Sequence, residues 1–316
     1  MFNELDTRKD IAIKIIKNEY GLNPLEIKRF TNGYCHSVYY VKVENNEFVI
    51  RITGKEEKEY YIGSIKWLAE LNSLGIPVPK LLKYGQYDDI FFTVITHIKG
   101  KDLGEIYQSL NDYQKKNIVK ELSNIQNKIS KINSMGLYGY PYSENNKLFV
   151  TWIDYLKSLI KRSIDRIIQN GIFNVEIGKS VIKILNSHKE YFENIKPIAF
   201  LDDITTKNVL VNEGTFSGIV DIDEICFGDS LLVIGLTNIA LISMGMDTNY
   251  IEYWLEEINA NTEQRKVVLF YTLLFCLDFM GEQGMRFNNE KIVEYDQSIV
   301  DKLNCIFNEL IIKLKM

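Results

Sequence analysis

One polar loop and the strand pair that follows it carry the side chains with the clearest chemistry. Asp203 and Asn208 stand five positions apart in the loop, and an apolar run follows at once. After a turn at Gly214, a second apolar run leads to Asp221 and Asp223. Phosphoryl transfer needs this arrangement: one Asp receives the proton of the attacking hydroxyl, while an Asn and a further Asp hold the Mg²⁺ that bridges the phosphates. We therefore predict Asp203 as the base and Asn208, Asp221 and Asp223 as metal ligands.

The same residues also have a simpler interpretation as a solvated turn. An Asp and an Asn at this spacing often occur together by chance, and acidic residues in loops are commonly just exposed. Two observations favour the catalytic interpretation. The strand–turn–strand pattern links the two acidic sites, and Asp221 and Asp223 follow a β-branched apolar stretch, where a carboxylate is costly unless it binds something.

The composition argues against several other classes of protein. The chain has 316 residues, of which 46% are apolar and 25% are charged, as is ordinary for a globular protein with a sizeable core. A net charge of −5 without a long basic run argues against nucleic acid as a partner. No signal peptide is visible, and no apolar run approaches the ~20 residues of a membrane span, so we expect no membrane contact.

The cysteines and histidines narrow the chemistry further. Cysteines at positions 35, 226, 276 and 305 show no metal-ligand spacing, and free thiols in a reducing cytosol are the simplest account. We therefore expect a cytoplasmic protein. Three histidines provide little material for a zinc site or a Ser-His-Asp hydrolase, and His36 is interpreted as a turn residue.

The order of the predicted elements indicates two lobes. Before residue 100 the pattern predicts a helix over 6–20, a second helix over 60–74, and strands over 27–30, 37–43, 47–52, 81–84 and 90–98. After Gly100 it predicts helices over 111–132, 150–170, 175–194 and most of 231–314. A short hinge near Gly100 is expected to join the two lobes.

The polar loop and the strand pair resemble the aminoglycoside phosphotransferase and choline kinase superfamily. The pattern there is His-Gly-Asp-x-x-x-x-Asn, then an Ile-Asp-Phe-like element, then Gly-Asp-Pro-like residues. The matching positions here are Asp203, Asn208, Asp221 and Gly228-Asp229. Leu201 stands where the family usually has His, and Asp202 where it usually has Gly. The resemblance covers most of the chain.

This resemblance implies an α+β, protein-kinase-like fold. Residues 1–99 would form a small N-terminal nucleotide-binding lobe with an antiparallel sheet, and residues 100–316 a large, mainly helical lobe with the catalytic and substrate-binding residues. The implied cofactors are ATP or GTP and Mg²⁺. Asp229 would tie down the catalytic loop by accepting backbone hydrogen bonds.

The predicted nucleotide site lies in the N-terminal lobe. A tight turn at Gly33 would let backbone N–H groups approach phosphate oxygens, and Ser37 would add a hydroxyl, although a simple hairpin turn explains the same residues. By resemblance, the inter-lobe connector would bind adenine through the backbone of Thr96 and Ile98.

Arg51 stands, by resemblance, where the family has a phosphate-contacting Lys on the third strand. A guanidinium can serve there, because its fork binds phosphate oxygens bidentately. The Glu that usually pairs with that Lys aligns with Ser64, so the sequence assigns no helix partner to Arg51.

The resemblance places the acceptor between the catalytic loop and the C-terminal helices, where carboxylates of the family pair with ammonium groups. Asp202, Glu224, Asp278 and Glu282 are the candidates for that part. Asp278 and Glu282 are four positions apart and share one helix face, which is equally consistent with a solvated helix edge.

The implied activity is ATP- and Mg²⁺-dependent transfer of the γ-phosphate to a hydroxyl of a small molecule. An aminoglycoside-type antibiotic is the leading acceptor, which would make the protein an antibiotic-resistance enzyme; a sugar, choline or an amino-acid alcohol is the alternative within the same class. A nucleotide-binding pseudokinase is the alternative from another class, favoured by Leu201 and Ser64 and opposed by the intact Asp203, Asn208 and Asp221. We expect a monomer or a weak dimer.

Overall fold

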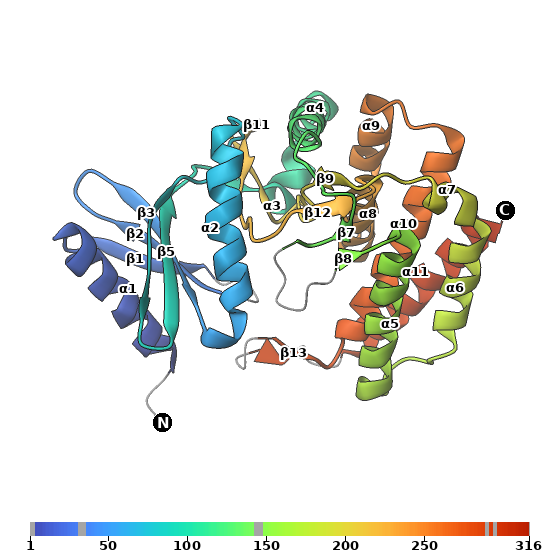
Figure 1. The fold of residues 1–316 in the computed structure, drawn as a ribbon, viewed down its shortest axis with the longest axis horizontal. Coiled ribbons are helices and arrows are strands. Elements are labelled where there is room, and N and C mark those ends of the chain that lie inside the picture. The colour runs from blue at the N-terminus through green and yellow to red at the C-terminus, as the bar shows by residue number, and fades with distance from the viewer. Residues whose placement is uncertain (1–3, 31–35, 142–147, 288–290, 293–295, 316) are drawn as a thin grey trace. The chain divides into compact units, whose positions relative to one another are not determined.

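The structure is a computed structural model that describes residues 4–30, 36–141, 148–287, 291–292 and 296–315. The chain forms two compact units. Unit 1 contains the chain up to Lys99 together with the later segment Gly218–Glu224, and unit 2 contains most of the remaining residues. One antiparallel sheet in unit 1 and the many helices of unit 2 confirm the predicted α+β, kinase-like fold (Figure 1).

Unit 1 is built on a five-stranded antiparallel sheet in the order β1-β2-β3-β5-β4. The strands are β1 (Glu26–Phe30), β2 (Ser37–Lys42), β3 (Glu47–Thr53), β4 (Leu81–Tyr87) and β5 (Ile90–Thr96). Most of them lie on the β-branched and aromatic runs that predict strands in the sequence. In the register of the sheet, Arg51 of β3 stands opposite Val38 of β2 and Thr93 of β5. Arg51 therefore occupies the central strand.

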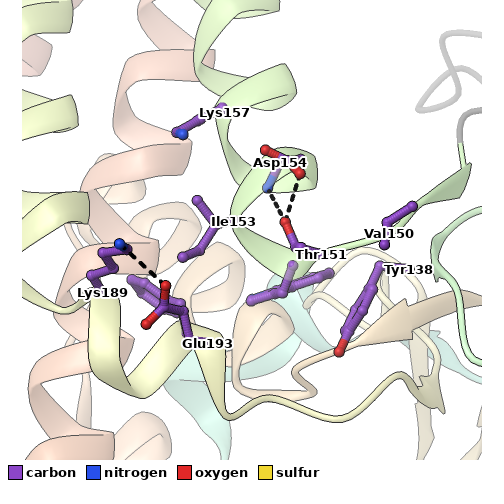
Figure 2. Close-up of a pocket in the computed structure, with 10 residues that line it drawn as sticks. Tyr138, Val150, Thr151, Ile153, Asp154, Lys157, Lys189 and Glu193 are labelled. Atoms are coloured by element: carbon purple, nitrogen blue, oxygen red, sulfur yellow. Dashed lines mark hydrogen bonds and ion pairs between the residues drawn. The ribbon is translucent and has the colours of Figure 1, made fainter.

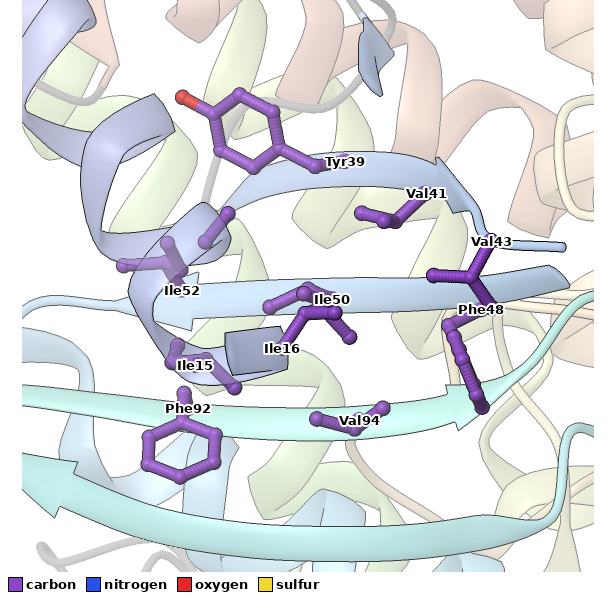
Figure 3. Close-up of a cluster of buried hydrophobic side chains, with 11 residues drawn as sticks. Ile15, Ile16, Tyr39, Val41, Val43, Phe48, Ile50, Ile52, Phe92 and Val94 are labelled. Atoms are coloured by element: carbon purple, nitrogen blue, oxygen red, sulfur yellow. The ribbon is translucent and has the colours of Figure 1, made fainter. Parts of the chain in front are cut away.

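One face of this sheet packs against α1 (Glu4–Tyr20) through a cluster of buried aliphatic and aromatic side chains (Figure 3). Ile15 of α1 contributes to the cluster together with Phe48, Ile50 and Ile52 of β3. Because successive side chains of a strand point to opposite faces, Arg51 points away from this cluster. The core of unit 1 thus fixes β3 and directs Arg51 to the other face.

The other helix of unit 1, α2 (Lys58–Ser73), contacts β4 and β5. It is followed by Gly75 in the left-handed conformation, with φ +67°, and the chain then turns at Pro77. The carbonyl of Pro77 accepts the backbone N–H of Ile219 at 2.9 Å. This bond holds the segment Gly218–Glu224 within unit 1, although it follows far later in the chain.

Unit 2 is mainly helical (Figure 1). Its helices are α3 (Leu103–Ile106), α4 (Asp112–Ile129), α5 (Trp152–Asn170), α6 (Ile177–Ser187), α7 (Lys189–Glu193), α8 (Leu231–Met244), α9 (Asn249–Glu257), α10 (Thr262–Glu282) and α11 (Gln297–Lys315). α10 packs against α5, α8 and α11. The residues 270–274 of α10 are buried in succession, as expected for a helix that is surrounded on all sides.

The starts of two helices follow from local capping. Asn111 accepts the backbone N–H of Gln114, and the Gln114 side chain accepts the backbone N–H of Asn111. Asn261 and Gln264 form the same reciprocal pair at the start of α10. Such capping boxes satisfy backbone donors that would otherwise lack a partner, and so they fix where each helix begins.

A short hairpin follows the polar loop. β10 (Val209–Asn212) and β11 (Thr215–Ile219) are joined by Glu213 and Gly214, which have φ values of +50° and +77°. Two positive φ values are those of a type I′ turn, whose twist matches that of the strands it connects. The turn predicted at Gly214 is confirmed.

Two features of unit 2 differ from the sequence prediction. The single helix predicted over 175–194 is broken at His188 into α6 and α7, because His188 has a non-helical backbone that the apolar spacing does not reveal. The second difference is a set of strands of two or three residues: β6 (Lys101–Asp102), β7 (Tyr138–Gly139), β8 (Leu148–Phe149), β9 (Ile198–Phe200), β12 (Cys226–Gly228), β13 (Arg286–Phe287) and β14 (Lys291–Ile292). Runs this short show no usable alternation of apolar and polar residues. Within the described residues, no helix is long and apolar enough to cross a membrane.

Gly235→Ala tests the close packing of α8 on α10. A Cβ at Gly235 would lie 2.4 Å from the Cβ of Tyr271 and 2.8 Å from its carbonyl carbon. Ala is favoured over Gly in a helix by about 1 kcal/mol, but forcing two packed helices apart costs about 1–3 kcal/mol. We therefore expect a net loss of stability in urea or thermal unfolding.

The matched control is Gly178→Ala in α6. Its new Cβ would meet only the end of the Ile164 side chain, which can rotate away. This variant should retain stability close to that of the wild type. Equal loss in both variants would contradict the packing argument.

Candidate active site

The polar loop of unit 2 holds Asp203 and Asn208 in a fixed relation. The side-chain amide of Asn208 donates to the backbone carbonyl of Asp203 at 2.9 Å, and the backbone N–H of Asn208 donates to the carbonyl of Thr205 at 3.0 Å. The hydroxyl of Thr205 donates to Oδ1 of Asp203 at 3.1 Å. Thr205 and Asn208 are buried, whereas Asp203 is exposed. The Asp203 carboxylate is therefore exposed, while the hydrogen bonds of Thr205 and Asn208 fix the loop beneath it.

The orientation of the Asn208 amide fits the predicted metal role. Its nitrogen is engaged by the carbonyl of Asp203, so the side-chain oxygen is the end of the amide that can contact a cation. Amide and carboxylate oxygens are the ligands that Mg²⁺ takes from proteins. The chemistry of this part of the site is thus compatible with Mg²⁺.

Gln126 of α4 fixes the chain just before the loop, and sequence reasoning missed it. Its side-chain oxygen accepts the backbone N–H of Leu201 at 3.0 Å, and its nitrogen donates to the carbonyl of Leu201 at 2.8 Å. The Leu201 side chain is buried. A residue that replaces the family's usual His is therefore anchored through its backbone. The only signal in the sequence was a polar residue beside the apolar face of α4, which the helical periodicity does not distinguish.

Asp202 has an interior partner, although it was predicted to bind substrate. Its carboxyl group accepts a hydrogen bond from the hydroxyl of Tyr140. Burial raises the pKa of Asp202 to about 7; the Tyr140 hydrogen bond opposes this increase and the negative charge of Asp203 adds to it. A carboxyl group with this pKa is a weak partner for a substrate ammonium group near neutral pH, which counts against the predicted role.

The second group of site residues lies in unit 1, around Arg51. Nη2 of Arg51 lies 2.8 Å from Oδ1 of Asp221 and 2.8 Å from Oδ2 of Asp223. Nε2 of His36 lies 3.0 Å from the same Asp223 oxygen, and its Nδ1 lies 3.0 Å from the hydroxyl of Thr53. His36 stands at a bend directly before β2, as expected for a turn residue, but its side chain is buried and contacts Asp223 and Thr53.

The two carboxylates of this cluster have different environments. The Asp221 side chain is 46% exposed and that of Asp223 only 16%. Burial alone would raise the pKa of Asp223, but the charges of Arg51 and His36 outweigh it and lower this pKa to about 2. Asp221 is held in the left-handed backbone region with φ +61°, which Asp tolerates better than most residues and which recurs at functional sites. Asp221 therefore offers the more accessible oxygen for a metal ion.

The residues predicted to contact phosphate near the start of β2 are only partly described. Gly33 lies outside the described residues. Ser37 is buried, and its hydroxyl accepts a hydrogen bond from Nη1 of Arg8 at 3.0 Å. This bond connects the start of β2 to α1, and it competes with any phosphate for the Ser37 hydroxyl.

The predicted adenine-binding residues lie at the end of β5. The backbone N–H of Thr96 donates to the carbonyl of Lys80 at 3.0 Å, and its hydroxyl accepts the backbone N–H of Lys80 at 2.9 Å. Ile98 packs beside Gly218, where an added Cβ would lie 2.9 Å from Cδ1 of Ile98. Since the Thr96 N–H is engaged, an adenine could use only its carbonyl together with the N–H of Ile98.

Asp278 and Glu282 share one face of α10, as the spacing predicts, but this face packs on α5. Asp278 accepts hydrogen bonds from Arg162 Nη2 at 3.0 Å, from Arg166 Nη1 at 3.1 Å and from the Ser163 hydroxyl at 2.8 Å. Burial and the neighbouring Asp278 raise the pKa of Glu282 to about 7, against the charges of the two arginines. The pair is therefore partly neutralised, which counts against a strongly acidic acceptor subsite.

The four acidic acceptor candidates do not form one group within a unit. Glu224 belongs to the segment Gly218–Glu224 of unit 1 and is half-buried. Asp202, Asp278 and Glu282 all belong to unit 2. Three of the candidates thus share unit 2 with the polar loop, whereas Glu224 shares unit 1 with Arg51.

Asp229 is structural, as expected, but its partners differ from the expected ones. Its Oδ1 accepts the backbone N–H of Leu231 at 3.0 Å, and its Oδ2 accepts the hydroxyls of Tyr191 at 3.1 Å and Tyr271 at 2.8 Å. These bonds fix the start of α8 and connect it to α10 and α7. They do not support the expectation that Asp229 ties down the catalytic loop.

A cavity of about 340 Å³ lies elsewhere in unit 2, beside the start of α5 and α7 (Figure 2). Thr151 and Asp154 are hydrogen-bonded to each other at its edge, and Lys189 forms an ion pair with Glu193. None of the described site residues predicted from the sequence lines it. Its polar groups serve helix capping and local ion pairing, so we assign it no part in the chemistry.

Comparison with known proteins connects both groups of residues to one family. The model of a family described as the phosphotransferase enzyme family matches residues 26–232. This range includes the polar loop of unit 2 and the Arg51 cluster of unit 1, whereas Asp278 and Glu282 lie beyond it.

The solved structures that are similar to nearly the whole chain include the following three. The GDP complex of an aminoglycoside 2′-phosphotransferase-IIIa is 14% identical with a TM-score of 0.69, covering 96% of this chain and 99% of that one. A putative fructosamine-3-kinase from Haemophilus somnus is 14% identical with a TM-score of 0.66, covering 95% and 96%. A thermostable mutant of aminoglycoside phosphotransferase APH(4)-Ia, solved with AMP-PNP and hygromycin B, is 16% identical with a TM-score of 0.61, covering 96% of each chain. Identities this low show a shared fold alone.

Asp202→Asn should change how stability depends on pH. The fold raises the pKa of Asp202 from its ordinary value of 3.8 to about 7, so the folded chain keeps a proton that the unfolded chain loses in this window. By linkage, the contribution of Asp202 to stability falls as pH rises through the window. Asn cannot ionise and still accepts a hydrogen bond from Tyr140.

The free energy of unfolding of the variant, relative to that of the wild type, should therefore increase as the pH rises from about 5 to about 8. Urea unfolding at both pH values measures this change. Asp10→Asn, at an exposed position of α1, is the control and should show no such trend. A difference between Asp202→Asn and wild type that stayed constant with pH would argue against a raised pKa.

Proposed function

Because this chain belongs to the phosphotransferase enzyme family, we propose that it transfers the γ-phosphate of ATP or GTP to a hydroxyl group of a small molecule, with Mg²⁺ as the metal cofactor. The family makes it a small-molecule phosphotransferase; the nucleotide, the metal and the acceptor are the proposal. The observation that carries it is the polar loop, in which an exposed Asp203 stands beside an Asn208 whose amide is fixed by hydrogen bonds.

Unit 2 would supply the base. Asp203 would accept the proton of the acceptor hydroxyl while the oxygen of that hydroxyl forms its bond to the γ-phosphorus; the bond from this phosphorus to the bridging oxygen breaks, and the nucleoside diphosphate leaves. The Thr205 hydroxyl donates to Oδ1 of Asp203 and so orients the carboxylate. Since phosphoryl transfer depends mainly on positioning and charge neutralisation, a fixed carboxylate is the contribution that the protein has to make here.

Unit 1 would supply the contacts to the nucleotide. Arg51 would bind phosphate oxygens. The Thr96 carbonyl and the Ile98 N–H would bind the adenine or guanine ring of the nucleotide. Asn208 and Asp221 are each proposed as a ligand for Mg²⁺, which would neutralise phosphate charge when bound. The accessible Asp221 carboxylate and the oriented Asn208 oxygen are what support this assignment.

An aminoglycoside-type antibiotic is the first candidate acceptor. Two of the similar structures are aminoglycoside phosphotransferases, one of them solved with hygromycin B. A less cationic hydroxyl compound, such as a sugar or sugar amine, is the second candidate. It is favoured by the pairing of Asp278 with Arg162 and Arg166, which leaves little excess negative charge for a polycation.

Turnover of ATP and GTP with Mg²⁺ across a panel of aminoglycosides, sugars, ketosamines, choline and amino-acid alcohols tests the proposal. Asp221→Asn removes a charge but keeps a residue that tolerates a positive φ, so it should abolish Mg²⁺-dependent turnover. The protein should stay folded, because Asp223 still pairs with Arg51. Asp88→Asn is the matched control, since Asp88 has φ +50° and is exposed in the β4–β5 turn. No turnover and no nucleotide binding by the wild type would overturn the proposal.

Asp203→Asn tests the base. The substitution keeps the size of the side chain and removes the proton acceptor, so kcat should fall ~10²-fold or more, the scale of general-base catalysis. Binding of nucleotide should change little, because Asp203 is proposed to act on the acceptor. Asp202→Asn is the neighbouring control and should be the milder change. A larger loss in Asp202→Asn would mean that the loop register is wrong by one residue.

A further inference from the structure

We propose that Asp223 is the positioning residue that holds Arg51 in place for the phosphates. In kinases of this fold, the phosphate-contacting cation of β3 is paired by a Glu of the neighbouring helix. Here Asp223, from the segment after β11, would pair with Arg51 in place of that Glu. The inference rests on the proposed function, because it assigns Arg51 to the nucleotide.

Arg51 needs an acidic partner because its side chain is only 6% exposed. A guanidinium buried without a countercharge costs several kcal/mol. The helix that would usually provide the partner has Ser64 at the aligned position. Ser64 is 1% exposed, and its hydroxyl donates to the carbonyl of Tyr61 at 3.1 Å, within its own helix. Ser64 therefore cannot neutralise Arg51.

The helix α2 supports Asp223 through the backbone instead. An added Cβ at Gly63 would lie 2.2 Å from the carbonyl oxygen of Asp223, so only Gly allows the helix and the segment to approach so closely. The hydrogen bond from Ile219 to Pro77 anchors the start of the same segment. Asp223 is thereby fixed within unit 1 at the place from which its carboxylate reaches Arg51.

The carboxylate of Asp223 is held from two sides. Its Oδ2 lies 2.8 Å from Arg51 Nη2 and 3.0 Å from His36 Nε2, and His36 in turn contacts Thr53 at 3.0 Å. A carboxylate bound by two partners has little freedom to rotate. It can therefore fix the guanidinium before a phosphate arrives, which lowers the cost of ordering it during binding.

Asp223 was predicted as a metal ligand, and the position of its Oδ1 bears on that alternative role. Its Oδ1 lies 2.7 Å from Arg51 Nη2 but makes no hydrogen bond to any described residue. The oxygen is nevertheless next to a full positive charge, which disfavours a second cation there. Asp221, with a more exposed side chain, is the better ligand, and the two roles predict different behaviour in mutants.

A double-mutant cycle of Arg51→Met and Asp223→Asn separates the roles. The readouts are the Kd of Mg·AMP-PNP or Mg·GMP-PNP by calorimetry, and the KM for nucleotide and kcat with an active acceptor. Each single variant should raise Kd and KM about tenfold, the size of one charge-assisted hydrogen bond, with a smaller effect on kcat. If Asp223 acts through Arg51, the double variant should match Arg51→Met alone, because the two effects are not additive.

Titration with Mg²⁺ provides the second readout. For nucleotide binding, Asp223→Asn should retain the Mg²⁺ dependence of the wild type, whereas Asp221→Asn should shift it. Asp223→Glu keeps the charge and should recover most of the affinity; if Asp223→Asn does not fold, a Kd and an Mg²⁺ dependence of Asp223→Glu close to those of the wild type remain the test. Additive effects, or a shifted Mg²⁺ dependence in Asp223→Asn, would overturn the positioning role while leaving the proposed function intact. A wild-type protein that binds no nucleotide would overturn both.

Discussion

The buried charge of Arg51 is the constraint on which the arrangement of unit 1 depends. Arg51 belongs to the central strand of the sheet, and its guanidinium is buried. A buried charge without a partner would cost several kcal/mol. The carboxylates that pair with it, Asp221 and Asp223, follow 170 and 172 residues later in the chain. Satisfying one charge thus requires the segment Gly218–Glu224 to belong to the unit that contains the sheet. Arg51, Asp221 and Asp223 are thereby gathered in one unit.

In unit 2 the constraint is the backbone of the polar loop, which has no helix or strand to supply its hydrogen-bonding partners. Buried backbone groups of such a loop must find side-chain partners. Gln126 serves both groups of Leu201, and Asn208 serves the carbonyl of Asp203. Neutral hydrogen bonds therefore fix the proposed base, whereas ion pairs fix the proposed phosphate contact.

The sequence was sufficient for features whose causes are local. The apolar and β-branched pattern predicted the strands of the five-stranded sheet, the hairpin that follows the polar loop and the long helices, and Gly214 predicted the hairpin turn. The contacts of His36 with Asp223 and of Gln126 with Leu201 could not be predicted, since the partners are 187 and 75 residues apart and no local pattern signals them. Spacing did place Asp278 and Glu282 on one helix face. It could not reveal that two arginines of another helix cover this face.

Burial and pairing, more than residue type, decide what the acidic side chains of unit 2 can do. Asp202 has a pKa raised to about 7, as does Glu282, and Asp278 is bound by Arg162 and Arg166. A polycationic acceptor would have to compete with these arginines for Asp278, and separating a partly buried ion pair leaves a charge without its partner. A neutral or singly charged acceptor meets no such cost. The environments of Asp202, Asp278 and Glu282 are therefore what supports the second candidate acceptor, a less cationic hydroxyl compound, beside the aminoglycoside that the family resemblance suggests.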